Sequence, residues 1–143
     1  WSTNTVIKIN GEKVSDKVIP GTYFAIDRNW RSGDTIELEL DFKLHFWYGE
    51  KEYAGKVSVY RGPLLYAYDA RFNNIDPNQL HQLDISTLKF ERSEFQGNIE
   101  PWIYGTLKDA NGAEIRVCDF SSAGQTGNKY CSWLPFAQSE TKK

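Results

Sequence analysis

The chain has 143 residues, of which 40% are hydrophobic, 15% aromatic and 25% charged. This length suits one domain and is enough to bury a core without disulfides or a metal. The net charge of −2 provides no basic field to hold phosphates, so we expect neither nucleic acid nor an anionic membrane as a partner.

The ends of the sequence suggest a piece of a longer protein. There is no Met anywhere, and the chain opens on Trp1. No apolar run approaches the ~20 residues that cross a bilayer. We therefore expect residues 1–143 to be a single domain, processed or excised from a longer chain. A fragment would have lost any signal peptide, so localisation stays open.

The N-terminal part reads as strands and turns. Residues 5–14, TVIKINGEKV, predict a hairpin because apolar and polar residues alternate around Asn10-Gly11, two residues that tolerate positive φ. A Pro-Gly turn then precedes a predicted strand that places Phe24 and Ile26 on one side.

The clearest pattern is a strict alternation over residues 35–47, TIELELDFKLHFW. It predicts one antiparallel strand with one face on a core and one in water. The opposite face is acidic and polar, and we interpret its carboxylates as solvated, because an open sheet surface raises no carboxyl pKa as a general acid requires. The apolar stripe consists of Ile36, Leu38, Leu40, Phe42, Leu44 and Phe46.

Three residues interrupt the strand-like run KVSVYRGPLLYAYDA, residues 56–70. Pro63 cannot donate to a strand ladder, so it belongs at a sheet edge, a strand start or a bulge, and Gly62 permits unusual backbone angles. Arg61 then projects from a rigid position, where its planar fork can bridge a carboxylate or main-chain carbonyls. It either fixes a corner of this domain or, with Gly62 and Pro63, forms a domain interface.

The second half adds short strands and one short helix. Asp76 and Pro77 predict the N-cap and first position of one or two helical turns. We interpret residues 71–100 as a long loop or an insertion. The predicted fold class is all-β, an antiparallel jelly-roll-like β-sandwich with at most one short helix near 76–83. Its last strands are expected at 87–92, 101–109, 114–120 and 129–136.

No catalytic signature is present. The sequence lacks a G-x-S-x-G elbow, an H-E-x-x-H pair and a phosphate-binding loop, and its two histidines cannot build a histidine-rich metal site. Cys118 and Cys131 are too few for a four-cysteine zinc site. They either pair across neighbouring strands, if the protein is exported, or remain reduced. We predict no catalytic residue, no metal and no cofactor.

Four aromatic residues near predicted strand ends are candidate sugar platforms: Trp47, Tyr48, Trp102 and Tyr104. Exposed rings can stack on the apolar faces of sugars without a charged partner. The alternative is that these rings belong to the core or to a domain interface.

Four segments occur in an order that resembles the C-terminal part of glycoside hydrolase family 127, a family of bacterial enzymes associated with β-L-arabinofuranosidase activity. They are INGE, PGTYFAIDRNWRSGDTIELEL, GKVSVYRGPLLYA and CDFSSAGQTGNKYCSWLP. The R-G-P-L-L-Y and S-A-G…W-L-P pieces are the most specific. Residues 71–100 have no counterpart in the family pattern.

The resemblance implies that catalysis lies elsewhere in the protein. In this family an N-terminal (α/α) barrel carries a cysteine nucleophile, a zinc ion held by cysteines and a glutamate, and an acid/base carboxylate. None of those motifs has a counterpart here, and Cys118 and Cys131 fall in the β region, so neither role is transferred to them.

Three hypotheses follow. The first is a non-catalytic C-terminal accessory β-sandwich that supports the N-terminal catalytic barrel of the same chain in plant-glycan degradation. The second is a carbohydrate-binding module that takes up oligosaccharide through its exposed Trp and Tyr residues. The third is a structural sandwich with a flat polar surface and no apolar patch left for a neighbour.

Overall fold

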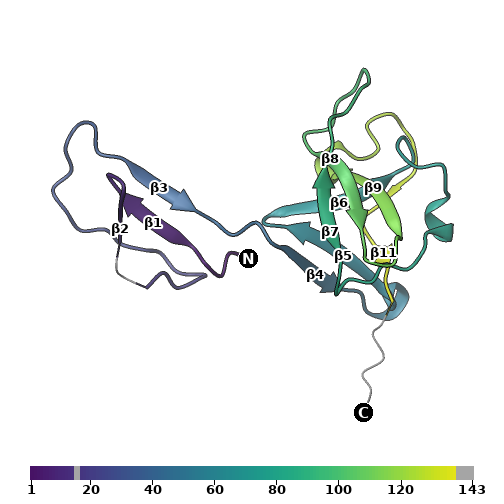
Figure 1. Ribbon diagram of the computed structural model, residues 1–143, viewed down its shortest axis with the longest axis horizontal. Helices are drawn as coiled ribbons and strands as arrows, with labels where there is room; N and C mark the ends of the chain where they lie inside the picture. The colour runs from purple at the N-terminus through teal and green to yellow at the C-terminus, as the bar shows by residue number, and fades with distance from the viewer. Residues whose placement is uncertain (15–16, 138–143) are drawn as a thin grey trace, which may run out of the picture. The chain divides into compact units, whose positions relative to one another are not determined.

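The computed structural model describes residues 1–14 and 17–137 (Figure 1). They form two compact units, Trp1–Lys43 and Leu44–Lys143, each treated by itself below. All pairings between the named strands are antiparallel, and the helical segments in the described residues are three short 3-10 turns. The predicted all-β antiparallel class is confirmed. No helix in the described part of the chain is long and apolar enough to span a membrane.

The first unit is a three-stranded sheet in the order β2-β1-β3. Its strands are β1 (Val6–Ile9), β2 (Glu12–Lys13) and β3 (Ile36–Glu39). Asn10 and Gly11 have φ of +51° and +81°, so the predicted hairpin is confirmed. The strand predicted around Phe24 and Ile26 does not form. β3 pairs with the free side of β1 instead, which leaves β1 without an open edge.

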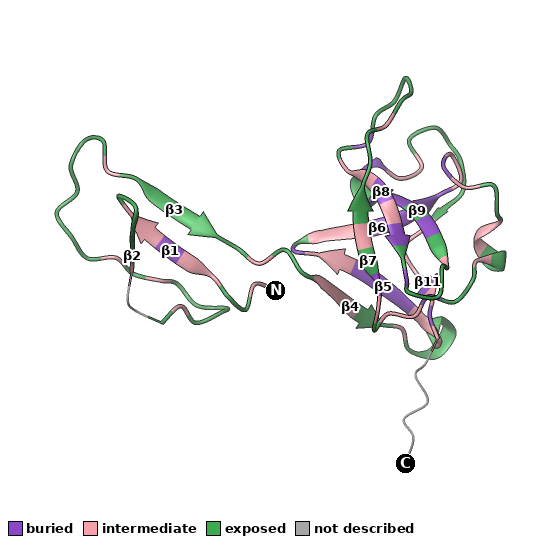
Figure 2. Ribbon diagram, viewed as in Figure 1, coloured by how far each residue is buried: buried purple, intermediate pink, exposed green. Residues whose placement is uncertain are grey.

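One face of this sheet is apolar and exposed. The register sets Ile7 opposite Leu38 and Ile9 opposite Ile36, so these four side chains share a face. Ile7 is the one buried side chain among the described residues of the unit (Figure 2). Ile36 is 52% and Leu38 61% exposed. The expectation that the whole alternating stripe packs on a core is therefore wrong for its first part.

The alternating stripe splits between the two units. β3 ends at Glu39, and β4 (Leu44–Tyr48) starts the second unit. Leu44 and Phe46 pack against the core of that unit, whereas Leu40 and Phe42 stay exposed. The predicted single strand is thus two strands in two different sheets.

The second unit contains an eight-stranded sheet in the order β11-β5-β6-β9-β8-β7, with β4 paired to β5 and β10 paired to β6. The sheet curls on itself, as Figure 1 shows, and its inward side chains form the core. Its other strands are β5 (Lys56–Arg61), β6 (Leu64–Asp69), β7 (Lys89–Arg92), β8 (Tyr104–Lys108), β9 (Glu114–Asp119), β10 (Tyr130–Cys131) and β11 (Leu134–Pro135). The 3-10 turns are η1 (Lys51–Tyr53), η2 (Pro77–Gln79) and η3 (Phe120–Ser122).

The core follows from period-two alternation along each strand. Valines of β5, tyrosines of β6 and aliphatic residues of β8 and β9 point to the same interior. The fully buried members include Val57, Val59, Tyr66, Tyr68, Leu107, Ile115, Val117 and Leu134.

Residues 71–100 contribute to the fold. They contain β7, and Leu83 is fully buried and forms an isolated parallel bridge with Phe136. The short helix predicted near 76–83 is the η2 turn, where Asp76 Oδ1 accepts a hydrogen bond from Asn78 N at 2.9 Å. That residues 1–143 make a single domain stays a prediction.

The Arg-Gly-Pro interruption is a tight hairpin turn. Arg61 pairs with Leu64, so Gly62 and Pro63 are the two turn residues between β5 and β6. Gly62 has φ of +57°, which suits the first position of a type II′ turn. Pro63 precedes the first residue of β6, where its missing N–H costs no ladder bond.

β5 and β6 separate beyond this hairpin, and residues 130–135 fill the fork. Cys131 of β10 pairs with Tyr68 of β6, and Leu134 of β11 pairs with Val57 of β5. The segment that carries the W-L-P motif therefore closes the sheet between its two central strands.

We expect the two parts of the alternating stripe to differ in their contribution to stability. Leu44→Ala should lower the free energy of unfolding by about 2 kcal/mol, because Leu44 is partly buried against the core. Leu38→Ala should change it by less than about 0.5 kcal/mol, because Leu38 is exposed. Urea denaturation followed by tryptophan fluorescence measures both. Equal losses of unfolding free energy in the two variants would contradict the division of the stripe between two sheets.

Candidate functional site

The four predicted sugar platforms lie in the second unit, on or next to the strands β4 and β8. Trp47 is 69%, Tyr48 53% and Trp102 84% exposed. Trp47 and Tyr48 are successive residues of β4 and point to opposite faces. β5, β6 and β9 separate β4 from β8, which follows Trp102. The structure therefore exposes three of these rings, and among the described residues no ring contact joins any two of them.

Tyr104 packs in an aromatic cluster. Its ring centre lies 4.8 Å from that of Phe72 and 5.5 Å from that of Phe95. Phe72 and Phe95 also contact each other edge to face at 5.5 Å. These contacts match the alternative interpretation, in which the ring packs within the domain. A sugar-binding role for Tyr104 stays a prediction.

Arg61 points to the core-facing side of β5, the side that also carries Val57 and Val59. Its guanidinium carbon lies 5.9 Å from the centre of the Phe90 ring. Burial raises the pKa of Tyr66 on the neighbouring strand, and the nearby charge of Arg61 acts against that rise. The expected domain-interface role of Arg61, Gly62 and Pro63 stays a prediction.

A buried carboxylate organises the turn after β9. Asp119 Oδ1 accepts a hydrogen bond from Ile103 N at 2.9 Å, and Oδ2 accepts one from Ser122 N at 3.1 Å. The Ser121 and Ser122 hydroxyls also donate to Oδ2. Burial raises the pKa of Asp119, but these hydrogen bonds to the ionised form outweigh burial and leave the pKa below its usual value.

A second buried carboxylate fixes the end of the same turn. Asp69 is fully buried and forms an ion pair with Arg71, at 3.1 Å between Nη2 and Oδ2. Gly124 N donates to Asp69 Oδ2 at 2.8 Å, and Arg71 Nη2 donates to Ser122 O at 2.8 Å. The S-S-A-G segment is thus held at both ends by side chains of β6 and β9.

The structure places the two cysteines apart as free thiols. Cys118 pairs with Ala67 on one side of β6, and Cys131 pairs with Tyr68 on the other. Two strand spacings, ~9.5 Å, separate them, more than the ~7 Å that a disulfide can bridge. Ala67 and Tyr68 also point to opposite faces. The disulfide alternative is therefore wrong. Burial raises the pKa of Cys118 to about 12, which makes its thiol unreactive.

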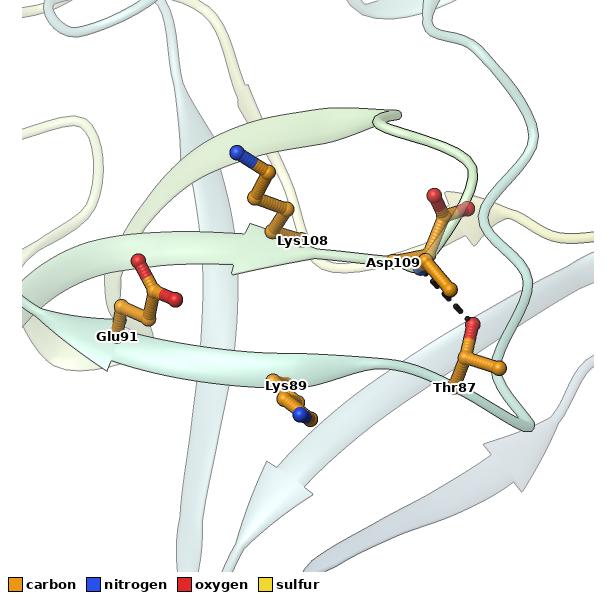
Figure 3. A pocket seen from close by; sticks show the side chains of 6 residues that line it. Thr87, Lys89, Glu91, Lys108 and Asp109 are labelled. Carbon is orange, nitrogen blue, oxygen red and sulfur yellow. Dashed lines mark hydrogen bonds between the residues drawn. The ribbon is translucent and has the colours of Figure 1, made fainter.

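Within the described residues no cluster of three or more His, Cys, Asp or Glu side chains could hold a metal ion. The hollow on the β7–β8 hairpin, about 400 Å³, is lined by both charge signs (Figure 3). The Asp109 carboxylate accepts hydrogen bonds of 2.8–3.0 Å from the backbone N–H groups of Asp84, Asn111 and Ala113. Lys89 lies directly opposite Lys108. The hollow thus contains two carboxylates, Glu91 and Asp109, and that of Asp109 is held by the backbone.

A pocket of about 280 Å³ with aromatic walls lies where residues 130–133 enter the fork between β5 and β6. Two aromatic pairs line it: Tyr53 with Trp133, and Phe120 with Tyr130. No sequence pattern predicted this site. Its rings come from η1, η3 and residues 130–133, and only the fold brings them together. Strand-end position, the signal used for the predicted platforms, does not identify them.

Comparisons with known proteins support the resemblance seen in the sequence. Residues 1–42 match the family model described as the β-L-arabinofuranosidase, GH127 middle domain. The match ends one residue before the boundary between the two units. No curated protein sequence matches this chain.

Three solved structures share the fold over most of the chain. A protein titled glycoside hydrolase has 24% identity and a TM-score of 0.71, covering 96% of this chain and 26% of its own. A GH127 β-arabinofuranosidase has 21% identity and a TM-score of 0.72, with coverage of 94% and 23%. A GH127 β-L-arabinofuranosidase from Geobacillus stearothermophilus T6 has 20% identity and a TM-score of 0.69, with coverage of 96% and 25%. The chain spans about a quarter of each of these proteins.

The lowered pKa of Asp119 predicts an acid-dependent loss of stability. The stabilising contribution of the Asp119 carboxylate is complete above ~3.9, the pKa of aspartate in the unfolded chain. That contribution is lost as the pH falls through the lower pKa of Asp119 in the folded protein. Asp119→Asn should therefore flatten the decline of unfolding free energy between about pH 5 and pH 2. Urea denaturation across that range measures the slope. An unchanged slope would show that the carboxylate does not titrate with folding.

Proposed function

Given its match to the GH127 middle domain and its shared fold, we propose that this chain is a non-catalytic accessory β-domain of a glycoside hydrolase. In this proposal it packs against an N-terminal (α/α) catalytic barrel of the same protein, which acts on a plant glycan. The family model is described as a middle domain, and the C-terminal position expected from the sequence belongs to the proposal.

The exposed apolar face of the first unit carries this proposal. Ile36, Leu38, Leu40 and Phe42 are each between 38% and 61% exposed, although they follow one another along one stripe. A soluble protein rarely leaves such a continuous patch uncovered unless it is an interaction site. The observation disfavours the third hypothesis, which requires a flat polar surface.

The size of the unit leads to the same conclusion. A unit of 43 residues buries too little apolar surface to be stable without added support. A three-stranded sheet is independently stable only when its hydrophobic face is buried against other parts of the protein. Here that face exists, but among the described residues of the unit it buries Ile7 alone. A large neighbouring domain would supply the missing layer.

The opposite face of the same sheet is suited to water. Lys8 lies opposite Glu37 and forms an ion pair with Glu39, and all three side chains alternate with the apolar stripe. The sheet therefore has one face for solvent and one for a partner, which indicates how the proposed barrel would approach it.

The alternative function is a carbohydrate-binding module, and the exposure of Trp102 and Trp47 is the observation in its favour. In this alternative either ring would stack on a sugar, and titration with oligosaccharides would show binding that Trp102→Ala or Trp47→Ala removes. Absence of that loss would rule out these two rings as the sugar site.

The accessory role predicts that Leu38→Glu weakens docking in the parent protein. A buried leucine contributes about 1.5–3 kcal/mol, so docking of the barrel should weaken roughly 30-fold. Glu37→Gln, on the solvent face of the same strand, is the matched control and should leave docking unchanged. Binding between the separately produced barrel and this chain is measured by calorimetry. Equal affinity for wild type and Leu38→Glu would contradict the proposed surface.

The same proposal predicts that the 143-residue chain alone hydrolyses no arabinofuranoside, because the cleaving groups lie in the barrel. An aryl β-L-arabinofuranoside provides the assay. Turnover by the purified chain that persists through further purification would overturn the non-catalytic assignment.

A further inference from the structure

We infer that the aromatic pocket in the fork between β5 and β6 is a binding site for a neutral sugar unit of an oligosaccharide. This site is separate from the proposed platforms at Trp47, Tyr48, Trp102 and Tyr104. It belongs to the second unit alone, so it does not depend on the docking face of the first unit.

The walls of the pocket are paired aromatic rings. Tyr53 stacks on Trp133 with ring centres 4.9 Å apart and planes 26° from parallel. Phe120 meets Tyr130 edge to face at 6.1 Å. Three of these rings remain about half exposed, with Tyr53 and Phe120 at 45% and Tyr130 at 50%. Each ring is thus held by a neighbour while part of its surface stays open to a ligand.

Pairing fixes the orientation of these rings before any ligand arrives. A stacked or edge-to-face pair holds its members by favourable ring geometry. Side chains that are already ordered lose little rotational freedom on binding, which favours affinity. The backbone adds rigidity, because β10 and β11 are hydrogen bonded to the two central strands of the sheet.

The polar groups of the pocket favour a neutral hydroxylated ligand. Lys56, Asn78 and Ser132 line it together with the rings. Their side chains offer an ammonium, an amide and a hydroxyl, which can donate to or accept from sugar hydroxyls. Among the described residues that line the pocket there is no Asp or Glu, and one lysine is too little positive charge to select a multiply charged anion.

The size of the pocket limits the ligand to a small unit. Pockets for drug-sized ligands occupy ~300–1,000 Å³, and this one holds about 280 Å³. A sugar ring presents apolar C–H faces to aromatic walls and hydroxyls at its rim, and so matches both parts of the lining. A purely apolar peptide side chain would leave the three polar groups without partners, at a cost in binding.

Titration of the 143-residue chain with neutral arabino-, xylo- and cello-oligosaccharides tests the inference. Binding is followed by the indole N–H signal of Trp133 in NMR spectra and by tryptophan fluorescence. At least one sugar series should give a saturable shift of the Trp133 signal at millimolar concentration. Absence of any saturable shift of that signal with all three series would overturn the site, and this readout needs no variant.

Variants then locate the bound sugar. Tyr130→Ala and Phe120→Ala remove half-exposed rings and should weaken binding about tenfold or more, with the dispersion of the NMR spectrum retained as evidence of folding. Trp102→Ala and Trp47→Ala remove exposed rings outside the pocket and should leave affinity unchanged. Loss of binding in the second pair with retention in the first would overturn the inference. Neither result alters docking of the barrel to the first unit.

Discussion

The burial of one alternating stripe is the constraint on which the structure depends. The stripe from Ile36 to Phe46 has the same period throughout, yet its members meet different environments. Leu44 and Phe46 enter the core of the curled sheet, whereas Ile36 and Leu38 are exposed on a three-stranded sheet that buries Ile7 alone among the described residues of its unit. Alternation fixes which side chains share a face, but it does not supply the layer that covers them. The proposed function follows from this exposed apolar face, because a face of this kind requires a partner.

Buried polar groups give the second unit its shape where alternation cannot. Asp119 and Asp69 hold the S-S-A-G turn from β9 and β6, and that turn leads into the chain that closes the fork. A carboxylate buried without partners would be costly, so each one restricts the turn to the geometry that supplies its hydrogen bonds. The turn also positions Phe120, and the closing segment carries Tyr130 and Trp133. The same hydrogen bonds that complete the fold therefore assemble the aromatic pocket.

Local sequence chemistry predicted the parts that depend on neighbours in the chain. The Asn10-Gly11 hairpin, the Asp76 N-cap and the all-β class are all confirmed, because turn geometry and capping involve a few consecutive residues. The prediction of one long strand was wrong, since the break after Glu39 depends on which sheet each half joins. The disulfide alternative was wrong for a similar reason, because register across β6 decides where Cys118 and Cys131 point. The aromatic pocket could not be predicted, since Tyr53 and Trp133 meet through long-range pairing.

Hydrogen–deuterium exchange on the first unit measures whether its apolar face needs a partner. We expect the amides of β1 and β3 to exchange rapidly in the isolated 143-residue chain, because Ile7 alone is buried among the described residues of their unit, and to become strongly protected in the parent protein. The amides of β6 and β9 should be protected equally in both, since their core is complete. Equal and strong protection of β1 and β3 in the isolated chain and the parent protein would contradict the account, because the apolar face would then need no partner.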